Sequence, residues 1–228
     1  MKPNLPGRAI QRGFSLLTGF ILAIIMFGTL AFFLAGQGIN AGFGSSYANT
    51  SKVSAMLASA GYISTGFDAV TLAGTTPANV TFDTTAVTGI FNPSSGGATV
   101  QNLDPTLFGR ALTTDGYWIY RGSDIRLYGV GTHTTGDYTV LAAGLKLSAC
   151  QQINTTLHGT LLTAAPPTLT GITDALLFGT TVTAATPTFT GLAVDLQTPA
   201  LGVSGWANGC YQTATANSYV YIHTLLAQ

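Results

Sequence analysis

The chain has 228 residues, and only 7% of them are charged, against about 25% in an ordinary soluble domain. It contains no glutamate, so all eight acids are aspartate, and the formal net charge is zero. Beyond residue 13 the chain has only five cations against all eight acids, so no basic face for nucleic acid is expected. The length allows one membrane helix and one globular domain of about 150–180 residues.

The N-terminus combines a short basic leader, residues 1–13, with a long uncharged segment. The leader holds three cations, Lys2, Arg8 and Arg12. Residues 13–51 carry no charged side chain, and the apolar core at 14–34 would span about 31 Å as a helix, enough to cross the hydrocarbon layer. The positive leader predicts that this end stays in the cytoplasm. An ordinary secretory signal, cleaved near residues 35–38, is the alternative.

Beyond the apolar core, side chains at spacings of three and four predict an amphipathic helix. Its apolar side consists of Val53, Met56, Leu57, Ala60, Ile63 and Phe67. Its polar side consists of Ser51, Lys52, Ser54, Ser59 and Ser64. No proline occurs between Pro6 and Pro77, so we predict one helix over residues 14–67, with a soft section at the glycines of residues 36–44.

Residues 12–17 form the junction Arg-Gly-Phe-Ser-Leu-Leu. With the basic leader before it and the helix after it, this segment resembles the class III signal peptide and N-terminal helix of type IV pilins and pseudopilins. The resemblance implies that a prepilin peptidase cuts between Gly13 and Phe14 and N-methylates Phe14. It also implies that the helix leaves the bilayer to form the core of a helical filament.

The chain departs from that family at one position of the helix. The family's glutamate, fifth from the cut, corresponds to Thr18 here. In the family this carboxylate pairs with the terminal amine of a neighbouring subunit, and an unpaired ammonium in an apolar core is costly. Thr18 implies that solvent or backbone carbonyls satisfy the amine, or that no neighbour's amine arrives, as in a minor subunit at a filament tip. It could also be uninvolved and bond back to its own helical turn.

Residues 68–228 are predicted to form a β-rich head domain, because short apolar runs alternate there with Gly, Pro, Asn and Thr. Residues 73–106 are predicted to be a loop region with one or two short strands. Residues 117–120 and 125–128 flank Arg-Gly-Ser-Asp at 121–124, which predicts a hairpin with its turn at these four residues.

A further strand is predicted at residues 138–145, then a short helix that Ser148 caps, and a last strand at residues 219–226. The expected fold class is α+β, with the long N-terminal helix packed on an antiparallel β-sheet, as in pilins.

The two cysteines, Cys150 in the short helix and Cys210 before the last strand, form an even pair beyond an export segment. This indicates one disulfide in an oxidising compartment, with two buried free thiols as the alternative. Closing the 150–210 loop, of about 60 residues, would contribute roughly 4 kcal/mol. Residues 148–154 resemble the cysteine-bearing helix of type IVb pilins.

A ten-residue segment occurs twice within the cysteine loop. Thr-Ala-Ala-Pro-Pro-Thr-Leu-Thr-Gly-Ile at 163–172 returns as Thr-Ala-Ala-Thr-Pro-Thr-Phe-Thr-Gly-Leu at 183–192. Two copies are too few for a solenoid, so we predict a duplicated, exposed strand–turn unit. Its threonine-rich face could be glycosylated or contact a surface.

Motifs that carry chemistry are missing from the sequence. It has no phosphate-binding loop, zinc-protease, serine-hydrolase or dinucleotide motif. His133 and Asp137 could suggest a metal or acid–base pair, but their glycine- and threonine-rich surroundings favour a surface loop. His158 and His223 stand alone in the sequence. We therefore expect no enzyme, no cofactor and no metal site.

Three hypotheses follow. The first is a structural subunit of a type IV pilus-like surface filament, acting in adhesion, motility, or DNA or phage contact. Its precursor would lie in the inner membrane, and its partners would be prepilin peptidase, assembly machinery with a cytoplasmic ATPase, and copies of itself. The second is a minor pilin or a periplasm-facing type II secretion pseudopilin that primes assembly. The third is a signal-anchored periplasmic adhesin or binding domain that never polymerises.

Overall fold

The computed structural model describes residues 41–99, 102–109, 118–127, 130–131, 136–161, 163–177, 194–196 and 206–228. The chain divides into two units between Ala48 and Asn49, and the packing described below is that of the second unit. In the described ranges, no helix combines the length and the apolar character needed to cross a membrane. The predicted leader and membrane segment, residues 1–34, lie outside these ranges.

Helix α2 (Ala41–Leu72) confirms the predicted amphipathic stretch and continues beyond Phe67. Gly42 and Gly44 lie inside this helix rather than in an unwound section, because a single glycine costs a helix only about 1 kcal/mol and does not break it. The predicted apolar side is buried at Val53, Met56, Ala60, Ile63 and Phe67, and partly buried at Leu57.

The head contains a five-stranded sheet with the order β3-β1-β2-β5-β4. Its strands are β1 (Trp118–Leu127), β2 (Asp137–Leu145), β3 (Val194–Leu196), β4 (Asn208–Gln212) and β5 (Tyr219–Leu226). Strands β1, β2, β5 and β4 are antiparallel neighbours, whereas the short β3 pairs in parallel with the end of β1. The predicted α+β class and antiparallel sheet are thus confirmed, with one parallel strand added. The strands expected at 138–145 and 219–226 are β2 and β5.

The predicted hairpin at residues 121–124 is wrong. These residues belong to the single strand β1, whose register with β2 shifts on both sides of Gly122. Gly122 has φ of 62°, a left-handed conformation that glycine adopts without strain and that some tight turns and some β-bulges use. The chain uses it for bulges that bend one long strand, and β2 supplies the antiparallel partner that the expected hairpin would have supplied.

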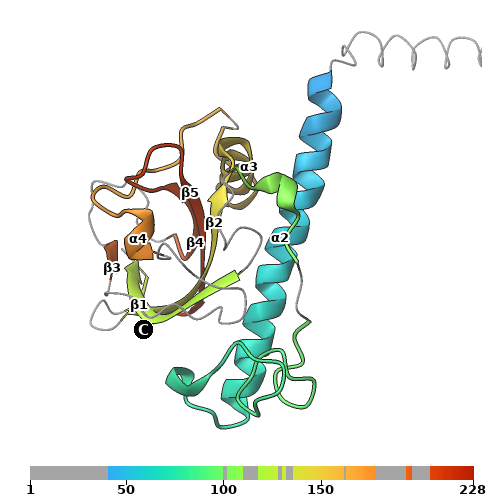
Figure 1. Ribbon diagram of the computed structural model, residues 1–228, viewed down its shortest axis with the longest axis vertical. Helices are drawn as coiled ribbons and strands as arrows, with labels where there is room; N and C mark the ends of the chain where they lie inside the picture. The colour runs from blue at the N-terminus through green and yellow to red at the C-terminus, as the bar shows by residue number, and fades with distance from the viewer. Residues whose placement is uncertain are drawn as a thin grey trace, which may run out of the picture. The chain divides into compact units, whose positions relative to one another are not determined.

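Both faces of the sheet are covered, and two apolar clusters result. Alternate strand residues such as Trp118, Val140 and Tyr221 join the cluster around α2, whereas Ile119, Leu141 and their neighbours form the second cluster. The second cluster is completed by the segment that carries α4 (Asp174–Leu177), so all nine residues of β2 are buried. Figure 1 shows α2 on one side of the sheet and α4 on the other.

The segment after α2 is irregular but tightly packed. It holds two single-turn helices, η1 (Pro77–Asn79) and η2 (Pro105–Leu107), and an isolated bridge between Thr81 and Gly89 in place of the expected short strands. Phe82 is buried and stacks on Tyr120 of β1 with ring centroids 4.4 Å apart. A loop rich in small polar residues is therefore held on the sheet by a few apolar anchors.

The first copy of the repeat runs beside β4. Thr168 forms a parallel bridge with Gln212, while Leu169 is fully buried in the second cluster. Thr163, Thr168 and Thr170 are exposed, so the threonine face is solvent-facing as expected, but the copy is anchored through its leucine. The second copy, residues 183–192, lies outside the described residues.

Candidate functional site

The predicted pair Cys150 and Cys210 forms a disulfide that joins α3 (Leu147–His158) to β4. The Cα atoms are 5.3 Å apart and both residues are fully buried. The prediction of a disulfide over two free thiols is confirmed. Helix α3 begins two residues earlier than a Ser148 cap would give, and Ser148 does not cap it, because Lys146 occupies the N-cap position and makes no side-chain cap bond.

One helical turn after Cys150, the Asn154 side chain binds the backbone of Cys210 twice. Its Nδ2 donates to the Cys210 carbonyl and its Oδ1 accepts from the Cys210 N–H, both at 2.8 Å. Positions four apart lie on one helix face, so Cys150 and Asn154 meet β4 together. The covalent link is thus reinforced by two buried hydrogen bonds, which the sequence reasoning missed although the i, i+4 spacing was visible.

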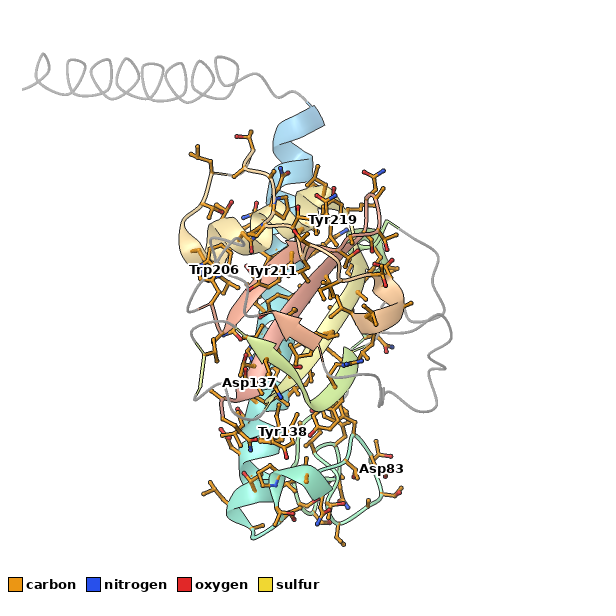
Figure 2. All side chains as sticks on the ribbon, turned by 90° about the vertical axis from the view of Figure 1, so that its left-hand side faces the viewer. Asp83, Asp137, Tyr138, Trp206, Tyr211 and Tyr219 are labelled. Atoms are coloured by element: carbon orange, nitrogen blue, oxygen red, sulfur yellow. A yellow bond between two sulfur atoms is a disulfide. The ribbon has the colours of Figure 1, made fainter. Side chains whose placement is uncertain are left out.

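A third residue of the same face, His158, contacts β4 one turn further on. Its Nε2–H donates to the Asn208 carbonyl at 2.7 Å, and its ring stacks on Trp206 with centroids 3.6 Å apart and planes at 8°. Gly209 allows this approach, because a Cβ there would lie 2.9 Å from Cε3 of the indole. Figure 2 shows Trp206 beside Tyr211, which carries the aromatic contact into the second cluster. His158 stands alone in the sequence but not in the fold.

Two serines assigned to the polar side of α2 instead bind the sheet. Ser59 is 3% exposed and accepts a hydrogen bond from Trp118 Nε1 at 3.0 Å. Ser64 Oγ lies 2.8 Å from His223 Nε2 in β5, and His223 Nδ1 lies 3.1 Å from the Tyr221 hydroxyl. The sequence predicts only that these serines lie on the polar side of the helix. Ser59 is buried and Ser64 is partly buried, because each meets a polar group of a distant strand.

The electrostatics of this junction follow from burial. Burial lowers the pKa of His223 from 6.5 to about 4, so the ring is neutral near pH 7. Burial also raises the pKa of the Tyr221 hydroxyl well above its usual value. A consistent proton arrangement has Tyr221 donating to Nδ1, Nε2–H donating to Ser64, and Ser64 donating to the Ala60 carbonyl at 3.3 Å. The chain of bonds joins β5 to the backbone of α2.

The glycine- and threonine-rich surroundings of Asp137 predict a surface loop, but the residue is buried at the start of β2. It is 1% exposed, and its carboxylate accepts from Leu127 N at 3.1 Å and from Gln228 N at 3.0 Å. The residue therefore joins the end of β1 to the backbone beyond β5. His133, its suggested partner, lies outside the described residues.

The remaining predicted site residues, Gly13, Phe14 and Thr18, also lie outside the described residues. Among the residues that are described, no group of three His, Cys, Asp or Glu side chains is placed to hold a metal ion. The polar contacts described above and the disulfide attach α2 and α3 to the sheet, so their role in this region is structural. No protein-family model, curated protein or solved structure matches the chain.

Proposed function

We propose that this chain is the structural subunit of a type IV pilus-like filament, made as an inner-membrane precursor and processed between Gly13 and Phe14. The observation that carries the proposal is the junction at residues 12–17. There a basic leader ends in Arg-Gly-Phe, and the segment that follows carries no charge as far as Ser51. Such a segment is stable in a bilayer and would bury a large apolar area if transferred to a filament core.

The packing of α2 supports the proposal. From Val53 to Phe67 the apolar stripe of this helix is buried in the head, and Ser59 and Ser64 bind strands β1 and β5. A helix held in this way attaches the head firmly to the polypeptide that precedes it. A filament subunit needs such an attachment, because force applied to the head must reach the helix that joins it to its neighbours.

The cross-link between α3 and β4 supports the same role. The disulfide joins residues 60 apart in the chain, and the two Asn154 bonds join residues 56 apart. A low charge density also favours close packing of copies, since few like charges would repel one another. The proposed role is mechanical and involves no catalysis, cofactor or metal.

The test is the N-terminus of the protein in the filament fraction sheared from cells. We expect abundant peptides that begin with N-methylated Phe14. Gly13→Val should abolish this processing and leave the precursor in the membrane, whereas Gly7→Val, a matched change in the same leader, should not. Chains that keep Met1 and occur only in membranes would refute the filament role and favour the non-polymerising anchored protein.

Thr18 favours a second candidate, the minor pilin or secretion pseudopilin that primes assembly. Without a carboxylate at this position, a neighbour's terminal amine has no ionic partner inside the bundle. The two roles differ in abundance, because a priming subunit is present in trace amounts beside a different main subunit. They also differ in response to Thr18→Glu, which should raise filament yield for a main subunit and change it little for a subunit at the tip.

A further inference from the structure

The sequence contains three Asn-x-Ser/Thr motifs of the kind that accept N-linked glycans, and the fold treats them differently. They begin at Asn49, Asn79 and Asn154, and a fourth, at Asn92, is blocked by Pro93. We propose that Asn79 is an N-glycan acceptor of the folded head and that Asn49 and Asn154 are not. The inference rests on the proposed function only in that the head must be exported to a compartment with a lipid-linked glycan donor.

Asn79 lies at the end of η1 and is exposed. Val80 follows in an extended conformation, with φ of −68° and ψ of 133°, and its side chain is buried. Alternate side chains of an extended segment point to opposite sides, so Asn79 and Thr81 both face away from the core. Thr81 is exposed as well, and its backbone is fixed by hydrogen bonds with Thr88 and Ile90.

This arrangement presents the two groups that define the motif to one side. The backbone N–H of Asn79 donates to the Thr76 carbonyl, but its side-chain amide makes no hydrogen bond to any residue that the structure describes, so both side-chain N–H protons are available. Figure 2 places the loop around Asp83, four residues later, at the opposite end of the head from Tyr219. A glycan at this place would not disturb the contacts of α3 with β4.

Asn154 is closed by the contacts that make it structurally important. It is 4% exposed, and its Nδ2, the atom that would carry the sugar, donates to the Cys210 carbonyl. The motif also lies in helix α3, where residues two apart are rotated by about 200° and face different sides. Glycosylation here would require local unfolding of the disulfide region.

Asn49 is a poor acceptor because its motif, like that of Asn154, lies within a helix. Its motif lies within α2, so Asn49 and Ser51 point to different sides of a continuous helix. Bringing the two side chains to one side would require unwinding the helix there, which its cooperative hydrogen bonds oppose.

The transfer itself needs one co-reactant, a lipid pyrophosphate-linked oligosaccharide. The Asn79 Nδ2 attacks the anomeric carbon of the first sugar, and a carbon–nitrogen bond forms. The bond from that carbon to the pyrophosphate oxygen breaks, and the lipid pyrophosphate leaves with the electron pair. One amide proton passes to a base of the transferase. No electron donor or acceptor is involved.

The test supplies the full-length chain, folded in detergent with its disulfide intact, to a purified oligosaccharyltransferase and its lipid-linked donor. Three synthetic peptides of equal length, each centred on one motif, report the reactivity of the motif without the fold. The modified positions are identified by mass spectrometry. We expect the Asn79 to Asn154 ratio to be at least about tenfold higher in the folded chain than in the peptides, because Asn154 reacts only from a rarely populated open form.

Variants sharpen the result. Asn79→Gln and Thr81→Ala should each abolish modification of the folded chain, whereas Thr81→Ser should restore it because the hydroxyl is retained. The inference is overturned if the folded chain shows the same site ratio as the peptides, or if Asn79 stays unmodified while its peptide reacts.

The protein from its own cells separates this inference from the proposed function. A surface chain that begins at Phe14 and carries only bare Asn79 overturns the glycan site and leaves the filament subunit standing. A chain that keeps Met1 but carries a glycan on Asn79 does the reverse.

Discussion

Gly61 and Gly66 lie on the same helix, α2, and an alanine at each position should have opposite effects on stability. A Cβ at Gly66 would lie 2.7 Å from Ala98 Cβ and 3.0 Å from the Ile90 carbonyl oxygen, so the loop packed on the helix would have to move. A Cβ at Gly61 would meet nothing within 4 Å. The pair therefore measures how closely the loop after α2 is packed on the helix.

The magnitudes follow from two terms. Replacing a glycine inside a helix by alanine stabilises by up to about 1 kcal/mol, and this gain applies at both positions. Overpacking at Gly66 costs about 1–3 kcal/mol. We expect Gly61→Ala to raise the free energy of unfolding by up to about 1 kcal/mol and Gly66→Ala to lower it by up to about 2 kcal/mol.

The assay is thermal and urea unfolding of the detergent-solubilised chain, followed by tryptophan fluorescence. For a unit of this size the difference between the variants corresponds to about 2–4 °C in Tm per kcal/mol. Equal stabilisation by both alanines would refute the reasoning, since it would mean that Ala98 and Ile90 are not packed against the helix.

Three further predictions concern the contacts of α3 with β4 and of α2 with β5. Cys210→Ser should lower the free energy of unfolding by roughly 4 kcal/mol and should also lower the filament yield. On a non-reducing gel, identical mobility of the wild type with and without a thiol reagent would contradict the disulfide. Asn154→Ala leaves two buried backbone groups of Cys210 without partners and should cost about 2–5 kcal/mol, whereas the exposed Thr156→Ala should change urea stability by less than about 0.5 kcal/mol. Because the pKa of His223 is lowered in the fold, its contribution is complete above about pH 6.5 and is lost as the pH falls towards 4, by no more than about 3 kcal/mol. His223→Gln should flatten the pH dependence of the urea midpoint over that range, and an unchanged slope would show that another group titrates.

The parts of the fold that were predictable are those set by local apolar patterns. The predictions of the apolar side of α2 and of strands β2 and β5 are confirmed, because each segment carries apolar residues at the period of its own secondary structure, and these residues are the ones buried in the core. The disulfide was predictable from the even number of cysteines beyond a predicted export segment, without knowing the geometry. The junction of Gly13 and Phe14 remains a prediction from sequence.

The errors have a common physical cause, which is that the deciding partner lies far away in the chain. The helical pattern assigns Ser59 to the polar side of α2 and gives no sign of its buried bond to Trp118, which lies 59 residues away in the chain. The glycine- and threonine-rich composition around Asp137 predicts a surface loop, because it does not reveal the two backbone N–H groups, of Leu127 and Gln228, that bind the carboxylate. Gly122 signals a left-handed residue, but only the long partner β2 decides that it makes a bulge and not a turn.

Of the contacts between α3 and β4, only the disulfide between Cys150 and Cys210 was predicted from the sequence. The spacing of Cys150, Asn154 and His158 by four residues was available, but asparagine and histidine on a helix face do not by themselves indicate a binding partner. Their role depends on β4 lying beside that face, which is a tertiary fact.

Strand β4 is the last in the sheet, and a strand in that place ordinarily offers unpaired backbone groups to strands of other molecules. Here the chain occupies those groups itself: His158 binds Asn208, Asn154 binds Cys210, and Pro167 and Leu169 bind Gln212. An arriving copy would find most of the outward-facing backbone groups of this strand already bonded. For a subunit that we propose is held as a membrane precursor before it polymerises, a closed edge would prevent aggregation by strand addition.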